Sequence, residues 1–164
     1  MVEKEREWMA NKRETMTLES TKSIQISLET IRSGDAGLNA HRQMMLGRTP
    51  ETGDWARFAL NSLELIDLAY LSAKTGHEFA ILRGKKEDIL FHGAVGSCNF
   101  VGVLEDMLMA HRLELIGHSH PGEPDPEPSP ADRQFLKDLG QARSTVISGM
   151  TGRIKEFTND PFEM

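Results

Sequence analysis

Two histidines and one aspartate in the C-terminal half have the residue types and spacing of a metal site. His118 and His120 are separated by one residue at the end of a short apolar segment, Leu113 to Gly117, which is typical of a β-strand. Alternate residues of a strand point to the same side, so both imidazoles can reach one ion. Asp132 lies beyond a proline-rich loop, in the first turn of the next predicted helix. Three such ligands leave a fourth tetrahedral position for water, as in catalytic zinc sites.

The chemistry that such a site predicts is zinc-dependent hydrolysis of a peptide or isopeptide bond. Zinc lowers the pKa of a bound water from about 15.7 to about 7. Glu78 begins a separate predicted strand, and its carboxylate is the candidate general base that takes the proton of that water. Ser129 precedes Asp132 by three residues and is the candidate donor to the oxyanion; losing one such donor costs about 2.7–4 kcal/mol of transition-state stabilisation.

Each of these features has a simpler explanation when it is taken alone. The segment Ser129-Pro130-Ala131-Asp132 is an adequate helix N-terminus, with a Ser cap, Pro at the first helical position and an acid in the first turn. Closely spaced histidines more often face solvent or satisfy core polar groups, and Glu78 alone reads as an exposed charge at a strand end. Their joint occurrence in this order favours a metal site.

The expected elements divide the chain into two parts. Residues 1–53 are polar and predict an N-terminal helical or partly ordered arm, and residues 54–164 predict the main domain. An α/β fold with a mixed β-sheet packed with helices follows from the order of the elements in that domain. These are a helix capped by Asp54 and stopped by Gly76, strands Glu78–Arg83 and Asp88–His92, a helix over about 100–112, the strand from Leu113, a helix from Ser129 through Leu139, and a hairpin of Thr145–Ser148 and Arg153–Phe157.

The loop between His120 and Asp132 is stiff, because it has prolines at positions 121, 124, 126, 128 and 130. Proline fixes φ and lowers the entropy lost when a loop is ordered. Asp125 and Glu127 in this loop either keep it solvated or contact a basic substrate tail. His92 is expected at the surface or at the border of the cleft.

Composition limits the other classes of function. The chain has 164 residues, 38% hydrophobic and 27% charged, which is ordinary for a globular protein. A net charge of -6 argues against nucleic-acid partners, which require clustered Lys and Arg. The single cysteine, Cys98, excludes thiolate-rich zinc sites and reads best as a small buried residue. No segment resembles a signal peptide or a membrane span, so we expect a cytoplasmic protein without membrane partners, with export by a signal-less route left open.

The metal-site residues resemble those of a known family. His118-Ser119-His120-Pro121, followed after seven residues by Ser129-Pro130-Ala131-Asp132, is similar to the JAMM signature of MPN-domain zinc metalloproteases, H-[ST]-H-P and then S-x-x-D. Glu78 resembles the upstream catalytic glutamate of that family, although the family's strand often contains glycine where this chain has Ala80 and Ile81. Glu64 and Glu87 are weaker candidates for this role. The resemblance covers roughly residues 54–157 and is nearest to the small bacterial branch.

What the resemblance implies is an α/β domain with cytidine-deaminase-like layering and one zinc per chain. It implies an enzyme, an isopeptidase that removes or processes a ubiquitin-like or sulfur-carrier-like modifier, with a protein or peptide as its partner. Two alternatives remain open. One is a zinc peptidase that acts on a small peptide or a cell-wall crosslink, and the other is a non-catalytic MPN-type interaction module.

Overall fold

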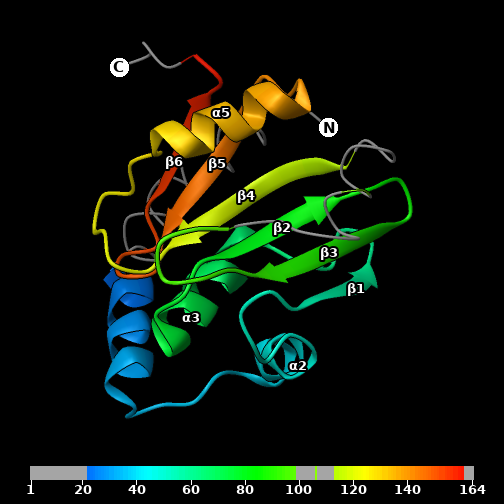
Figure 1. Ribbon diagram of the computed structural model, residues 1–164. Helices are drawn as coiled ribbons and strands as arrows, with labels where there is room; N and C mark the ends of the chain where they lie inside the picture. Colours follow the sequence, from blue (N-terminus) through cyan, green and yellow to red (C-terminus); the bar gives the residue numbers. More distant parts are fainter. Residues whose placement is uncertain (1–21, 99–105, 107–112, 161–164) are drawn as a thin grey trace, which may run out of the picture.

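A six-stranded mixed β-sheet is the centre of the computed structural model, which describes residues 22–98, 106 and 113–160 (Figure 1). The strand order is β1-β3-β2-β4-β5-β6, and only β4 and β5 pair in parallel. The predicted α/β fold with a mixed sheet is therefore confirmed. The strands are β1 (Trp55–Ala59), β2 (Phe79–Arg83), β3 (Glu87–His92), β4 (Glu114–His120), β5 (Arg143–Ser148) and β6 (Ile154–Thr158).

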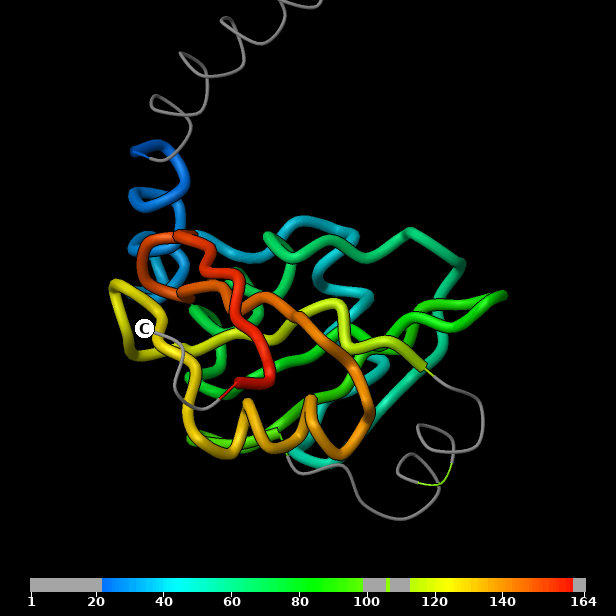
Figure 2. Tube along the Cα trace, turned by 90° about the horizontal axis from the view of Figure 1, so that it is seen from above, coloured from blue at the N-terminus to red at the C-terminus, as the bar shows by residue number. Residues whose placement is uncertain are grey.

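Helices cover both faces of this sheet. The helical segment 22–33, α2 (Ala40–Arg48) and α3 (Leu65–Thr75) lie on one side, and α5 (Pro130–Leu139) lies on the other (Figure 1). Seen from above in Figure 2, the segment 22–33 and α5 also lie toward opposite edges of the molecule. None of the helices within the described ranges is long and apolar enough to cross a bilayer. The helix expected over 100–112 lies outside the described residues, apart from Asp106.

The two faces of the sheet have separate apolar clusters. Along β2, Phe79 and Ile81 belong to the cluster under α3, whereas Ala80 and Leu82 belong to the cluster under α5. This alternation follows from the two-residue period of a strand. All four side chains are fully buried, so β2 is a central strand with no solvated face.

Residues of the N-terminal part belong to this core. The helical segment 22–33 contributes Leu28, and α2 contributes Met45; both side chains have no exposed surface. They pack in the same cluster as Leu68 of α3. Helices over 22–33 and 40–48 thus pack in one core with α3.

The helix predicted to start at Asp54 is wrong in about its first half. Residues 55–59 form β1 at the edge of the sheet, where Trp55 is paired with Phe91 of β3. The apolar residues of this segment have helical spacing, but the segment forms a strand. Because this strand lies at the edge of the sheet, most of its residues are partly or fully exposed and do not show the alternation typical of a buried strand. Pairing with β3, which is distant in sequence, decides between the two structures.

The helix itself begins at Leu65 and ends where it was predicted to end. Glu64 is its N-cap, and a capping box joins Glu64 and Asp67 through reciprocal side-chain to backbone hydrogen bonds. Gly76 ends the helix in the left-handed conformation, with φ of 76°.

A buried ion pair ties the β2–β3 hairpin to the start of α3. Asp88 has no exposed surface; its Oδ1 accepts a hydrogen bond from Nε of Arg83 at 2.8 Å and its Oδ2 accepts one from the backbone N–H of Leu63 at 3.1 Å. Burial alone raises the pKa of Asp88, but the hydrogen bonds from Arg83 and from the backbone outweigh it and hold that pKa below its ordinary value.

An irregularity in β4 decides which way the two histidines point. Ile81 of β2 pairs with Gly117, but the next residue, Leu82, pairs with Leu115, so Ile116 has no partner on β2. One extra residue of this kind is a β-bulge, which shifts the alternation of the strand. Leu115 therefore faces α5, and so does His118, three residues later.

Gly117 is required beside this bulge, because α3 packs directly on it. A Cβ at position 117 would lie 2.3 Å from Cδ2 of Leu65 and 2.8 Å from the carbonyl oxygen of Thr145. The Leu65 side chain can move, but the backbone oxygen cannot move without disturbing β5. We expect Gly117→Ala to lower the free energy of unfolding by about 1–3 kcal/mol, measured by urea denaturation. Gly122→Ala is the control, since nothing lies within 4 Å of that position.

Candidate metal centre

The three side chains predicted as metal ligands converge on one point. Nε2 of His118 lies 3.1 Å from Nε2 of His120, and Oδ2 of Asp132 lies 3.2 Å and 3.4 Å from these two nitrogens. Ligands bound tetrahedrally to zinc at about 2.0–2.1 Å are separated by roughly 3.3 Å. The three atoms thus have the spacing of three corners of a zinc tetrahedron.

Glu78 also lies close to the two histidines. Glu78, His118 and His120 form a buried group that could hold a metal ion, with their ligand atoms all within 4.8 Å of one another. Asp132 is less buried, with 19% of its side chain exposed, but its oxygen is within 3.4 Å of both nitrogens. Glu78 is therefore near enough to the histidines to be a ligand itself or to act on a water beside the ion.

The β4 strand positions both histidines on one face, as their spacing predicts. His118 pairs with Ala80 on β2 and with Val146 on β5, and His120 pairs with Ser148. Ser119 points to the opposite face, where its Oγ contacts Ser72 of α3 and accepts a hydrogen bond from the backbone N–H of Phe79.

The start of α5 positions Asp132. Oγ of Ser129 accepts a hydrogen bond from the N–H of Asp132 at 3.0 Å, and Oδ2 of Asp132 accepts one from the N–H of Ser129 at 2.8 Å. The predicted Ser cap is confirmed, and with Asp132 it forms a capping box. The Oδ2 atom that completes the cap is the one that faces the two histidines, so helix capping and metal binding are compatible at this residue.

The site favours positive charge. Burial lowers the pKa of His120, but its hydrogen bonds to Asp132 and Glu123 outweigh burial and raise the pKa of His120 to about 9. Burial raises the pKa of Asp132, yet the hydrogen bonds to His118 and His120 hold it far below its ordinary value. Carboxylates and imidazole lone pairs that meet in a buried place are the donor set of a divalent cation.

Glu78 is held by the backbone that follows β3. Its N–H donates to the carbonyl of Ala94 at 2.8 Å, and its carbonyl accepts from the N–H of Gly93 at 2.7 Å. Burial raises the pKa of Glu78 to about 7, with the nearby Asp132 and Glu123 charges adding to the increase and His120 opposing it. A pKa near neutrality suits a group that takes up and releases a proton.

Cys98 is half-buried, and its side chain interacts with Glu78. Burial, followed by the charge of Glu78, raises the pKa of the Cys98 thiol well above its ordinary value. A thiol with a raised pKa stays protonated near neutral pH, which does not favour a role for Cys98 as a thiolate nucleophile.

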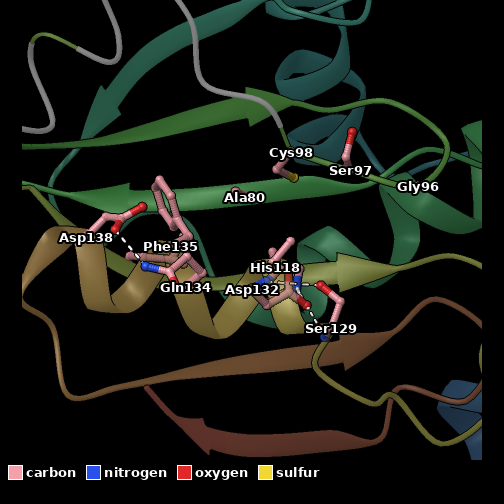
Figure 3. A pocket seen from close by; sticks show the side chains of 12 residues that line it. Ala80, Gly96, Ser97, Cys98, His118, Ser129, Asp132, Gln134, Phe135 and Asp138 are labelled. Atoms are coloured by element: carbon pink, nitrogen blue, oxygen red, sulfur yellow. Dashed lines mark hydrogen bonds and ion pairs between the residues drawn. The ribbon is translucent and has the colours of Figure 1, made fainter. Parts of the chain in front are cut away.

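Two cavities meet at the metal-site residues. One has a volume of about 270 Å³ and lies against α5, with apolar walls that include Ala80, Leu115 and Phe135 (Figure 3). The other has a volume of about 700 Å³ and lies against the proline-rich loop. Ser129 and Asp132 line both cavities. An extended peptide that occupied both cavities would therefore cross the site.

The remaining residues singled out in the sequence have other surroundings. Glu87 pairs with Arg57, and Glu64 caps α3, so neither faces the site. Asp125 and Glu127 form ion pairs with Arg153 and Lys155 and so attach the proline-rich loop to β6 and the turn before it.

His92 is not at the surface, where the sequence placed it. Its ring is 1% exposed and stacks on Phe79, and its Nδ1 hydrogen-bonds the carbonyl of Thr49. Its Nε2 lies 2.7 Å from Nδ1 of His77. The pairing of β3 with β2 brings His92 opposite Phe79, which a single sequence does not indicate.

One residue of the site was not found from the sequence. Glu123 has its Oε2 atom 3.1 Å from Nδ1 of His120. The sequence feature that could have indicated Glu123 is its position, three residues after the candidate ligand His120 in a proline-rich loop.

Comparisons of the chain with protein-family models, with curated proteins and with solved structures found no match.

Proposed function

We propose that this chain is a zinc-dependent hydrolase that cleaves a peptide or isopeptide bond. The observation that carries the proposal is the triangle of Nε2, Nε2 and Oδ2 atoms from His118, His120 and Asp132, with sides of 3.1–3.4 Å. Because these distances match a zinc tetrahedron, the residues fit the metal. Oxygen-only cation sites, which suit Mg²⁺ and Ca²⁺, do not have this donor set.

When bound, zinc supplies Lewis-acid chemistry and makes water a nucleophile at neutral pH. Glu78, with its pKa raised to about 7 by burial, takes a proton from the attacking water and returns it to the departing amine. Ser129 accepts the N–H of Asp132 through its oxygen and so keeps its hydroxyl proton available for the oxyanion.

The substrate that we propose is a protein with a ubiquitin-like or sulfur-carrier-like modifier. Support for this comes from the similarity of the site residues to the JAMM signature and from two cavities that meet at the site, since an extended tail needs space on both sides of its scissile bond.

The test is metal content together with cleavage. We expect about one zinc per chain in protein purified without chelator, measured by mass spectrometry of the elements. That protein should cleave at least one member of a panel of ubiquitin-like fusions, isopeptide-linked modifiers and sulfur-carrier fusions. A chelator should abolish cleavage and added zinc should restore it. Cleavage that persists in chelator, or a chain that binds no zinc, would contradict the proposal; cleavage of short peptides alone would favour a small-peptide peptidase.

A further inference from the structure

We propose that Glu123 is a positioning residue of the metal site. Its carboxylate holds the proton of His120 on Nδ1 and thereby directs the lone pair of Nε2 toward His118 and Asp132. The inference rests on the proposed function for the presence of a metal ion. At many metal sites a carboxylate accepts the N–H of a ligand histidine that faces away from the metal, and this hydrogen bond fixes the tautomer and the orientation of the ring. We assign this role to Glu123.

The contact between Glu123 and His120 leaves one tautomer for metal binding. Oε2 of Glu123 lies 3.1 Å from Nδ1 of His120, and an ionised carboxylate can only accept a hydrogen bond. Nδ1 must therefore carry a proton, and in the neutral ring Nε2 then carries the lone pair. Nε2 is the atom that lies 3.1 Å from the corresponding nitrogen of His118.

The backbone around Glu123 is fixed to the rest of the domain. Oε2 of Glu123 also accepts the N–H of Glu127 at 2.9 Å, and the carbonyl of Glu123 accepts the hydroxyl of Ser148 at the end of β5. The neighbouring carbonyl of Pro124 accepts the hydroxyl of Thr151. Because these contacts are local to the loop and to β5, the carboxylate is presented at His120 without help from a ligand.

His118 lacks an equivalent contact within the described part of the chain. Its Nδ1 atom is buried and has no hydrogen-bond partner there. Among the described residues, a hydrogen bond therefore fixes the tautomer of His120, and none fixes the tautomer of His118. Removal of Glu123 should consequently weaken metal binding, although Glu123 is not one of the proposed ligands.

The size of the effect follows from the exposure of Glu123. Loss of an outer carboxylate at a metal site typically weakens metal affinity about 10–100-fold. The Glu123 side chain is 49% exposed, so water can partly replace it at Nδ1. We therefore expect Glu123→Ala to weaken zinc binding by roughly 10-fold, at the lower end of that range. Glu123→Gln should have a smaller effect, because its amide oxygen can still accept the N–H of His120.

The experiment measures zinc affinity of the whole chain by competition with a chromophoric chelator, without substrate. Long-range nitrogen–proton NMR spectra of the zinc-loaded protein report the proton on Nδ1 of His120. In Glu123→Ala that proton should exchange faster with solvent, and in Glu123→Gln it should remain protected. Asp125→Asn is the matched control, since it removes the ion pair to Arg153 on the same loop and leaves Glu123 in place.

The inference is overturned if Glu123→Ala binds zinc as tightly as the parent chain, or if Asp125→Asn weakens binding equally. Circular dichroism shows whether each variant is folded, and Glu123→Gln gives the comparison if Glu123→Ala is not. Failure of the proposed function is a separate result. If zinc affinity depends on Glu123 but the protein cleaves no substrate, the positioning role of Glu123 is supported and the proposed hydrolase function is contradicted.

Discussion

Replacing Glu78 with glutamine is expected to lower kcat by about 10²–10⁴-fold, the usual contribution of a general acid–base group. Glutamine keeps the shape of the side chain but cannot take a proton from water. The zinc content should not change, because His118, His120 and Asp132 supply the closely spaced ligand atoms. The measurement is steady-state kinetics on the substrate found by the panel, with metal analysis of the same protein sample.

The pH dependence of kcat gives a second readout of Glu78. Burial raises its pKa to about 7, and the active form is the carboxylate, so activity rises as the pH increases through that pKa. A bound cation favours the carboxylate and lowers the pKa, which places the acidic limb of the profile at or below pH 7. The profile of Glu78→Gln should lack this limb.

The control for Glu78→Gln is Glu87→Gln, which makes the same change on β3 in an exposed pair with Arg57. Its kcat should stay within about 2-fold of the parent value, since Glu87 does not face the site and an exposed ion pair contributes only about 0–1 kcal/mol to folding stability. A Glu78→Gln enzyme with the activity of the parent chain would remove Glu78 from the mechanism. Loss of zinc in Glu78→Gln would instead make Glu78 a metal ligand, in line with its position in the buried group with both histidines.

Replacing Asp132 with asparagine is expected to abolish zinc binding at micromolar metal and, with it, cleavage. The amide oxygen of asparagine can still accept the N–H of Ser129, so the capping box of α5 is retained. The negative charge that faces Nε2 of both histidines is lost. The variant therefore separates the role of Asp132 in metal binding from its role in the helix.

Thermal unfolding with and without chelator measures this effect. A ligand at 100 times its Kd stabilises the folded state by about 2.7 kcal/mol. Chelator should thus lower the Tm of the parent chain and leave the Tm of Asp132→Asn unchanged. Asp138→Asn is the matched control on the same helix, where the carboxylate accepts a hydrogen bond from Gln134. If Asp132→Asn keeps its zinc, Asp132 is not a ligand.

The local features of the site could be predicted from the sequence, because each depends on neighbouring residues. The one-residue spacing of His118 and His120 places both on the same face of any extended strand. The capping box of Ser129 and Asp132 begins α5, and it needs only hydrogen bonds between residues three positions apart in the sequence. The candidate ligand residues and the start of α5 could therefore be predicted from local spacing.

The direction of the histidines was decided by tertiary structure. Regular alternation along β4 would place His118 on the face opposite to Leu115, away from α5 and Asp132. The bulge at Ile116 reverses this. Beside it, Gly117 pairs with Ile81 of β2, and α3 packs against Gly117 through Leu65. Such contacts join segments far apart in the chain, and no local pattern records them.

The same reason explains what else the sequence did not reveal. Residues 55–59 became a strand through pairing with β3, and His92 became buried through the pairing of β3 with β2. Glu123 meets His120 because β5 and its turn anchor the loop between them. The sequence by itself determined which atoms can bind a metal. Only the tertiary structure determined that they face one another, since that depends on long-range pairing and packing.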